Sequence, residues 1–324
     1  MKAWTMAAAS SFLLSTTKYL TRLALDPVTF GINDDSDNVA SRLPSLARLQ
    51  QLQESHLARI PFENLAQHGC RDPAVLDVQA TAHKILDCQR GGFCFELNTL
   101  FGTFLRQLGY TVHFVLAHVH RGGDTGYADD ATHVILIVEA TDEDDDDDAT
   151  RTTRPYYVDV GFGEPPLHPL DYTMFGMEQQ TPEGMKSKLV RDGDVVELYW
   201  LQKGTWQPRL RWSYADSLKS IEMADMAAGM AIVQTPESIF SQKIIAARIT
   251  RTTKQTLAGS RYKVTGPPRF QQDGSQGPKH VQQLSSALQA QELLEKEFAM
   301  PVSSTSGLAL EKSLAAAEEV WSNF

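Results

Sequence analysis

The residue with the clearest capacity for chemistry is Cys94, which lies in the segment Arg90-Gly-Gly-Phe-Cys-Phe-Glu-Leu-Asn98. Two glycines before it allow a sharp turn and a close approach of the backbone to a substrate. Apolar residues then recur at helical spacing from Phe95 to Gln107, which predicts a helix that begins at or near Cys94. The dipole and the free N–H groups of a helix N-terminus stabilise a thiolate. These features favour a nucleophile over a core cysteine.

A cysteine nucleophile needs a base and a group that orients the base, and two downstream segments offer both. His133 lies in the predicted strand 132–139, and Asp159 lies in the next one, 156–160. A histidine in a strand is often structural, but an ionised carboxylate in an apolar strand needs a partner. If the strands pair, Cys94 can attack a carbonyl, His133 can move protons and Asp159 can orient the imidazole, in a cysteine-protease-like triad. The backbone N–H of Cys94 would then form half of an oxyanion hole.

The negative charge of the chain is concentrated in one place. The 324 residues carry a net charge of −10, and residues 142–148 are all acidic. No basic stripe indicates nucleic-acid binding, and a negative surface does not favour anionic membranes. We therefore expect small molecules as partners, and neither nucleic acid nor a membrane. The acidic run is interpreted as a solvated loop without the turn glycine and spacing of a metal site, so we predict no bound metal.

The cysteine content points to a reducing compartment. Cys70, Cys88 and Cys94 are too few, and odd in number, for a disulfide framework. A reducing compartment keeps a thiol available, so we predict a cytoplasmic protein. No apolar run reaches the roughly 18–20 residues of a membrane span. The residues before Asp26 contain no acid and a small-residue apolar patch, which fits a weak targeting peptide or, as we favour, an extension leading into the first helix.

The coarse secondary structure changes along the chain. The pattern is mainly helical up to about residue 110, and then strands separated by turns predict an antiparallel sheet that can close into a barrel. The last third mixes both types, with a helix running into a strand over 238–249. The other predicted helices cover residues 19–25, 43–59, 81–88, 95–107, 281–298 and 308–321, and the other predicted strands cover 111–120, 188–190, 195–202, 209–214 and 261–264.

Five segments, taken together, resemble the motifs of the arylamine N-acetyltransferases. The segment around Cys94 looks like the active-site motif of that family, and Ile60-Pro-Phe-Glu-Asn-Leu65 is similar to a second motif. Thr132-His133-Val134 and Val158-Asp-Val-Gly-Phe-Gly163 resemble the segments that hold its histidine and aspartate. Thr235-Pro-Glu-Ser-Ile-Phe240 resembles a fifth segment. The order is the same from about residue 19 to about residue 298, and the tail resembles that of eukaryotic-microbial members.

The resemblance implies an α+β fold with a helical bundle, an antiparallel β-barrel and an α/β lid. We expect a helical domain at 1–110 that carries Cys94, and a barrel at 111–234 that carries His133 and Asp159. The lid would cover 235–300 and the tail 301–324. The acidic segment 141–154 is read as an insertion, because the family usually joins its histidine and aspartate strands by a short turn.

The resemblance also implies a ping-pong reaction. Cys94 would take an acyl group from acetyl-CoA, or from malonyl-CoA, and an arylamine, hydrazine or arylhydroxylamine would then attack the acyl-cysteine. Acyl-CoA is expected as a substrate, and no bound cofactor is expected. Alternatives are an arylamine N-malonyltransferase, a cysteine amidase or transglutaminase-like hydrolase that passes the acyl group to water, and a catalytically silent binder.

Further site residues follow from the same motifs. Arg90 and Glu63 correspond to a buried ion pair that shapes the site, and Asn98 is expected to brace the nearby loop. Phe93 and Phe162 are candidates for an acceptor pocket, with plain core packing as the alternative. The candidates for coenzyme A contacts are weaker and comprise Thr235, Ser238, Ser241, Gly259 and Ser260.

Overall fold

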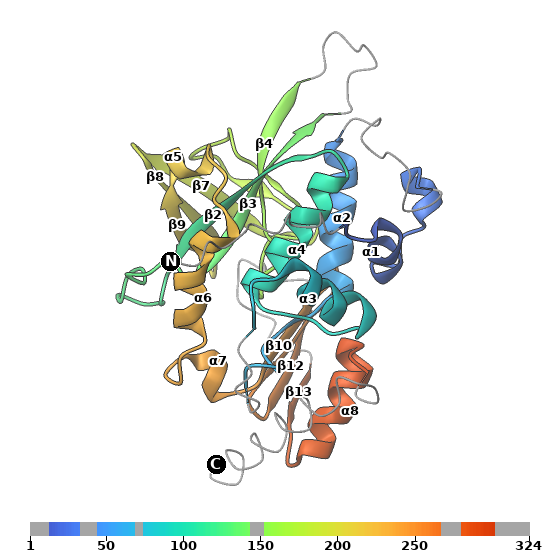
Figure 1. The fold of residues 1–324 in the computed structure, drawn as a ribbon. Helices are drawn as coiled ribbons and strands as arrows, with labels where there is room; N and C mark the ends of the chain where they lie inside the picture. Colours follow the sequence, from blue (N-terminus) through green and yellow to red (C-terminus); the bar gives the residue numbers. More distant parts are fainter. Residues whose placement is uncertain (1–12, 33–43, 69–73, 143–151, 267–279, 302–324) are drawn as a thin grey trace, which may run out of the picture.

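The computed structural model describes residues 13–32, 44–68, 74–142, 152–266 and 280–301. It places a barrel-like sheet, a group of helices and a second sheet around one another (Figure 1). This arrangement confirms the predicted α+β fold with an antiparallel barrel. In the part of the chain so described, no helix is both long and apolar enough to cross a membrane.

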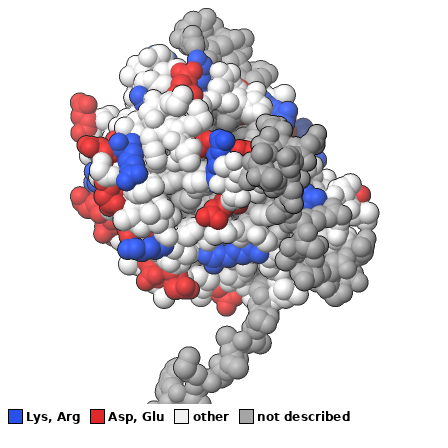
Figure 2. All heavy atoms as spheres, turned by 90° about the horizontal axis from the view of Figure 1, so that it is seen from above, with Lys and Arg blue, Asp and Glu red and all other residues white. Residues whose placement is uncertain are grey.

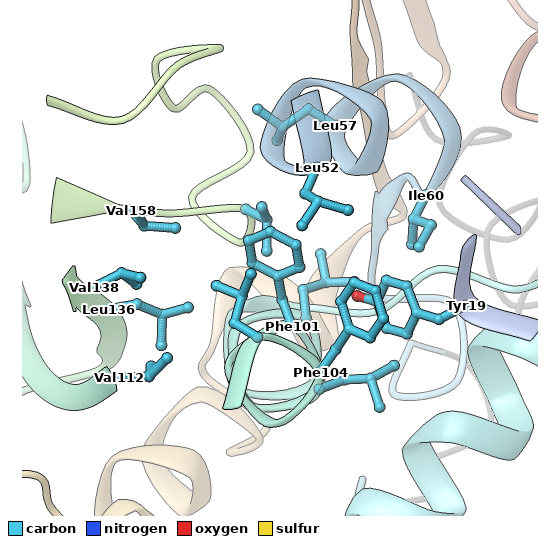
Figure 3. Close-up of a cluster of buried hydrophobic side chains, with 14 of the residues drawn as sticks. Tyr19, Leu52, Leu57, Ile60, Phe101, Phe104, Val112, Leu136, Val138 and Val158 are labelled. Atoms are coloured by element: carbon cyan, nitrogen blue, oxygen red, sulfur yellow. The ribbon is translucent and has the colours of Figure 1, made fainter. Parts of the chain in front are cut away.

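The helices of the first part are built around α4. They comprise α1 (Thr16–Arg22), α2 (Leu46–Arg59), α3 (Val78–Ala82), a π-helical turn (His83–Asp87) and α4 (Cys94–Gln107). Phe101 and Phe104 of α4 lie between Leu136 and Val138 on one side and Tyr19 on the other (Figure 3). Burying a phenylalanine side chain contributes about 1.5–3 kcal/mol, so these contacts hold α4 firmly between helices and sheet.

The large sheet has eight strands in the order β5-β4-β3-β2-β9-β8-β7-β6. A glutamine side chain links its two edge strands: the backbone N–H of Asp171 donates to Gln179 Oε1 at 2.7 Å, and Gln179 Nε2 donates to the Asp171 carbonyl at 2.9 Å. The amide thus replaces a peptide group and nearly closes the barrel. The strands are β2 (Thr111–Val119), β3 (His133–Thr141), β4 (Thr153–Val158), β5 (Leu170–Asp171), β6 (Gln179–Gln180), β7 (Lys186–Asp192), β8 (Val195–Gln202) and β9 (Thr205–Ser213).

Side chains alternate between the two faces of β3. Leu136 and Val138 belong to the core shared with α4, whereas Ile135 and Ile137 belong to the core inside the barrel. His133 and Glu139 continue the inward row at its two ends. The inside of the barrel therefore has one end near His133 and another near Glu139.

The acidic insertion leaves the pairing of β3 and β4 in register. The strands pair from Leu136↔Val158 to Thr141↔Thr153, and residues 143–151 of the insertion lie outside the described residues. Because the insertion joins the strands at the Thr141 end, it lies at the opposite end of β3 from His133. The register that the two site segments require is therefore kept.

The second sheet has the order β1-β10-β11-β12-β13 and packs with α8 (Ala287–Phe298) in a separate core. The predicted helix 281–298 is wrong in its first part, because β13 (His280–Gln283) pairs with β12 and Ser286 starts the helix by accepting from the Gln289 N–H. Strand β11 and helix α6 were not predicted. The elements are β1 (Phe62–Glu63), α5 (Tyr214–Ser217), α6 (Ala227–Val233), α7 (Ile239–Gln242), β10 (Ile245–Ile249), β11 (Lys254–Ala258) and β12 (Arg261–Thr265).

Charged side chains are mixed on the face seen from above. Lysine and arginine atoms are interspersed with aspartate and glutamate atoms within a larger uncharged area (Figure 2). On the described residues of this face, no stripe of one sign is visible.

Candidate active site

Cys94 is the first residue of α4. The preceding Phe93 is extended, with φ −99° and ψ −178°, so the chain enters the helix directly at the cysteine. The thiol is buried, and its Sγ points to the Thr132 carbonyl oxygen at 3.7 Å. The N–H of a residue at this position has no carbonyl partner within the helix, so it is available for a bound oxyanion.

His133 and Asp159 form a buried pair beside the thiol. His133 Nε2 donates to Asp159 Oδ2 at 2.8 Å, and the two side chains are 3% and 0% exposed. Since Nε2 is engaged by the carboxylate, Nδ1 is the ring nitrogen left to exchange a proton with Cys94.

The Asp159 carboxylate accepts from four donors. Oδ2 also accepts from the Tyr157 hydroxyl at 3.0 Å, while Oδ1 accepts from Asn98 Nδ2 at 2.9 Å and from the Gly161 N–H at 2.7 Å. Every one of these groups donates, so the site is built for an ionised carboxylate. Tyr157 was missed in the sequence, although its i−2 spacing from Asp159 places it on the same face of an extended segment.

The pKa of His133 is raised to about 10. Burial alone would lower it, but the charge and hydrogen bond of Asp159 outweigh burial, and Cys94 adds in the same direction. At neutral pH the imidazole is therefore poised as an imidazolium, which stabilises an adjacent thiolate.

This shift makes the free energy of unfolding dependent on pH. A histidine with an ordinary pKa of about 6.5 when unfolded binds its proton more tightly in the folded state, so its contribution is complete below pH 6.5 and is lost as pH rises toward about 10. We expect urea denaturation to show stability falling between pH 7 and pH 10, with a shallower fall in His133→Gln. The exposed His280→Gln is the control and should keep the wild-type slope. Equal slopes in all three proteins would contradict the assignment.

Asn98 and Gly161 dock the start of α4 onto the barrel. Asn98 lies one turn after Cys94, donates to the Val134 carbonyl at 2.7 Å and accepts from the Val160 N–H at 2.9 Å. A Cβ atom at Gly161 would lie 2.7 Å from Cys94 Cα, so only glycine allows this approach. The bracing expected for Asn98 therefore has a visible set of contacts.

Arg90 and Glu63 form a bidentate buried ion pair. Arg90 Nη2 donates to Glu63 Oε1 at 2.9 Å and to Oε2 at 3.1 Å, and the side chains are 3% and 0% exposed. Burial tends to raise the pKa of Glu63, but Arg90 and then Lys84 outweigh it, so that pKa is lowered. The backbone N–H of Glu63 also donates to the Gly92 carbonyl at 2.8 Å, next to the cysteine segment.

A second buried pair, missed in the sequence, extends this network. Lys84 Nζ contacts both Glu96 oxygens, at 2.8 and 2.9 Å, and Glu96 Oε2 accepts from the Phe93 N–H at 3.2 Å. A glutamate at the third position of a helix is a known N-terminal signature and could have identified Glu96. The two pairs fix both ends of the turn that presents Cys94.

The two candidate pocket residues have different surroundings. Phe93 is buried, with its ring edge-on to Phe95 at 6.2 Å between centroids, as core packing requires. Phe162 is half-buried, and its ring lies 5.0 Å from His133 and 5.5 Å from Trp200. Phe162 is thus the one placed as a wall beside the triad.

Arg209 extends this wall and was not identified from the sequence. Its Cζ lies 4.2 Å from the Trp200 ring and 5.6 Å from the Phe162 ring. The pairing of β8 and β9 shifts between Leu198 and Tyr199, which leaves Arg209 without a cross-strand position in β8. Such bulges redirect side chains near functional sites.

The weak coenzyme A candidates lie on two neighbouring turns. Ser238 caps α7 by accepting from the Phe240 N–H, and Ser241 Oγ accepts from Gln67 Nε2 at 3.0 Å. Gly259, with φ +56°, and Ser260 form the β11–β12 turn, where the Gly259 N–H donates to the Ile244 carbonyl just after α7. Thr235 precedes them, and its carbonyl accepts from the Ser238 N–H. The contacts seen for these residues do not reach the triad.

No metal centre is evident in the described ranges, since no group of three or more histidine, cysteine, aspartate or glutamate side chains converges there. The chemistry on the page is that of a thiol, an imidazole and a carboxylate. This set can transfer acyl groups through a covalent cysteine intermediate.

Comparison with known proteins gives one family. A family model described as N-acetyltransferase matches residues 45–306. The chain is 38% identical over 120 residues to the arylamine N-acetyltransferase pineal gland isozyme NAT-3 of Gallus gallus, an alignment that spans 37% of each chain. It is 30% identical over 243 residues to the arylamine N-acetyltransferase of Mycolicibacterium smegmatis, covering 74% of this chain and 78% of that one. Its fold resembles that of Mycobacterium marinum arylamine N-acetyltransferase in complex with CoA, with a TM-score of 0.73, 26% identity and coverage of 94% and 99%.

Proposed function

Because this chain belongs to the arylamine N-acetyltransferase family, we propose that it transfers an acetyl group from acetyl-CoA to arylamines, hydrazines or arylhydroxylamines. The observation that carries the proposal is the placement of Cys94 at a helix N-terminus beside His133, whose Nε2 lies 2.8 Å from Asp159. This set supplies a nucleophile, a proton carrier and an orienting anion in contact with one another.

In the first half-reaction Cys94 is acylated. The thiolate attacks the thioester carbonyl carbon, the Cys94 N–H stabilises the oxyanion, and the carbon–sulfur bond to coenzyme A breaks. The His133 imidazolium gives its proton to the departing coenzyme A thiolate. One thioester replaces another, so the exchange is nearly balanced in free energy.

In the second half-reaction the acceptor nitrogen attacks acyl-Cys94. The neutral His133 Nδ1 takes the proton released by the amine, and the Cys94 carbon–sulfur bond breaks to give the amide. Asp159 holds the imidazole through Nε2 in both halves. We assign Phe162 to the acceptor wall, Phe93 to its support, and the turns at 235–241 and 259–260 to coenzyme A.

The test is mass spectrometry of the intact protein mixed with acetyl-CoA. We expect one acetyl adduct that maps to Cys94 and disappears when an arylamine such as 4-anisidine is added, with formation of the acetylated amine. Cys88→Ser should keep the adduct, and Cys94→Ala should lose it. An adduct that decays equally fast without amine would instead indicate a hydrolase, and its absence in the wild type would refute the proposal.

One observation favours malonyl-CoA as the alternative donor. The Arg209 Nε atom is buried without a hydrogen-bond partner in the described residues, and its guanidinium borders Phe162 beside His133. A buried unpaired donor is unfavourable, and a carboxylate on the acyl group would satisfy it.

A donor panel separates the two cases. A hydrogen bond to a charged group is worth about 1.5–3 kcal/mol, so we expect Arg209→Gln to lower malonyl transfer relative to acetyl transfer by roughly 10- to 100-fold if malonyl-CoA is used. Arg211→Gln, on the same strand but over the Tyr127 ring, is the matched control. An unchanged ratio would leave acetyl-CoA as the donor.

We also propose a cytoplasmic location. Cys88 and Cys94 are both free thiols, and a reducing compartment keeps a nucleophilic cysteine in that form.

A further inference from the structure

A cavity of about 360 Å³ opens at the end of the barrel opposite the triad. Its walls include His113, Glu139, Tyr172, Phe175, Tyr214 and Leu218. Glu139 lies six residues after His133 on the inward row of β3, which at about 3.3 Å per residue places it roughly 20 Å away. The cavity is therefore separate from the site described above, and its volume suits a one-ring ligand.

Two polar groups in this cavity lack partners. His113 Nδ1 is buried without a hydrogen bond, and the Glu139 carboxylate makes no hydrogen bond or ion pair with the residues the structure describes. In contrast, the Tyr172 hydroxyl is satisfied, since it accepts from Trp212 Nε1 at 2.9 Å and donates to Ser217 Oγ at 3.0 Å. Leaving buried polar groups unpaired costs about 1–3 kcal/mol each, so an occupant with N–H donors would be stabilised.

The other walls are aromatic. The Tyr172 and Tyr214 rings are nearly parallel, at 12° with centroids 6.0 Å apart, and Phe175 stands edge-on to Tyr172 at 5.3 Å. Such surfaces favour a flat ring by stacking and edge contacts. The Arg191 guanidinium already lies 3.4 Å from the Tyr214 ring centroid, so a ligand with a full positive charge would be repelled there.

We propose that this cavity binds a neutral one-ring arylamine or arylhydrazine, as a second, non-catalytic site for the acceptor class. The ring would contact Tyr172, Phe175 and Tyr214, while the two N–H donors of the amino group would pair with Glu139 and His113 Nδ1. The role as an acceptor site rests on the proposed function, but the binding itself does not.

The test is a ¹⁹F NMR titration with 4-fluoroaniline in the absence of acyl-CoA. We expect two binding events in the wild type, of which one is weakened about tenfold or more by Glu139→Gln and abolished by Leu218→Trp, which fills the cavity mouth. Glu292→Gln, at an exposed position of α8, should leave both events unchanged. Fluorobenzene, which lacks N–H donors, and 4-fluorobenzylamine, which is a cation, should bind this site at least tenfold more weakly.

The outcomes are decisive in both directions. Titrations that Glu139→Gln and Leu218→Trp leave unchanged would refute the site, as would equal binding of fluorobenzene or tighter binding of 4-fluorobenzylamine. Both variants should form the Cys94 adduct at the wild-type rate, which excludes misfolding as the cause of lost binding. Failure of the adduct in the wild type would refute the proposed function while leaving the titration interpretable.

Discussion

Asp159→Asn should lower kcat/KM for arylamine acylation by about 10⁴-fold, the size of effect seen when the orienting carboxylate of a triad becomes an amide. Oδ1 and Oδ2 of Asp159 each accept from two donors. Whichever way the new amide turns, its NH₂ group faces two donors and can satisfy neither. His133 then turns or changes tautomer, and Nδ1 no longer receives the Cys94 proton.

The measurement is the rate of Cys94 acylation in a rapid-quench experiment, together with circular dichroism to show that the fold persists. Tyr157→Phe is the matched control, because it removes one donor and leaves the carboxylate intact. We expect it to slow acylation less than about tenfold, in line with the loss of one hydrogen bond. An Asp159→Asn variant that stays within tenfold of the wild type would remove Asp159 from the catalytic set.

Arg90→Met should destabilise the fold by about 3–5 kcal/mol, because Glu63 would be left as a buried and poorly compensated charge. Lys84 Nζ lies 3.9 Å from Glu63 Oε1 but is bound to Glu96 at 2.8 Å, so it cannot replace the bidentate contact. The double variant Glu63→Gln/Arg90→Met removes both charges and should recover part of the loss.

Urea denaturation at neutral pH measures this effect. Lys18→Met is the control, since Lys18 and Asp87 form an ion pair whose side chains are 62% and 41% exposed, and exposed pairs contribute about 0–1 kcal/mol. Arg90→Met with no greater loss than Lys18→Met, or a double variant less stable than both single variants, would show that the buried pair does not act as described.

The sequence predicted the main parts of the site because each was signalled locally. The apolar period after Cys94 predicted α4, and strand composition around His133 and Asp159 predicted β3 and β4, whose register brings the three side chains together. The α+β fold was predicted for the same reason. The catalytic roles themselves remain predictions for the experiments above.

Other parts depend on contacts between distant segments and had no local signal. Strand β1 is only Phe62–Glu63 and exists because β10 pairs with it. Arg209 faces Phe162 because of a shift in register between β8 and β9. The start of α8 was misplaced because Val281-Gln-Gln-Leu284 continues an apolar spacing that suits a helix, while pairing with β12 makes it a strand.

The pairing of β1 with β10 has a consequence for how the protein matures during synthesis. Residues 62–64, which hold Arg90 through Glu63, are themselves held by Phe240, Lys243 and the strand 245–249. A ribosome releases those late residues long after Cys94 has emerged. The nascent chain therefore carries its thiol without finished surroundings, and acyl transfer can begin only when the last quarter of the polypeptide has been added. Chains that terminate early would contain all three triad residues and yet be inactive.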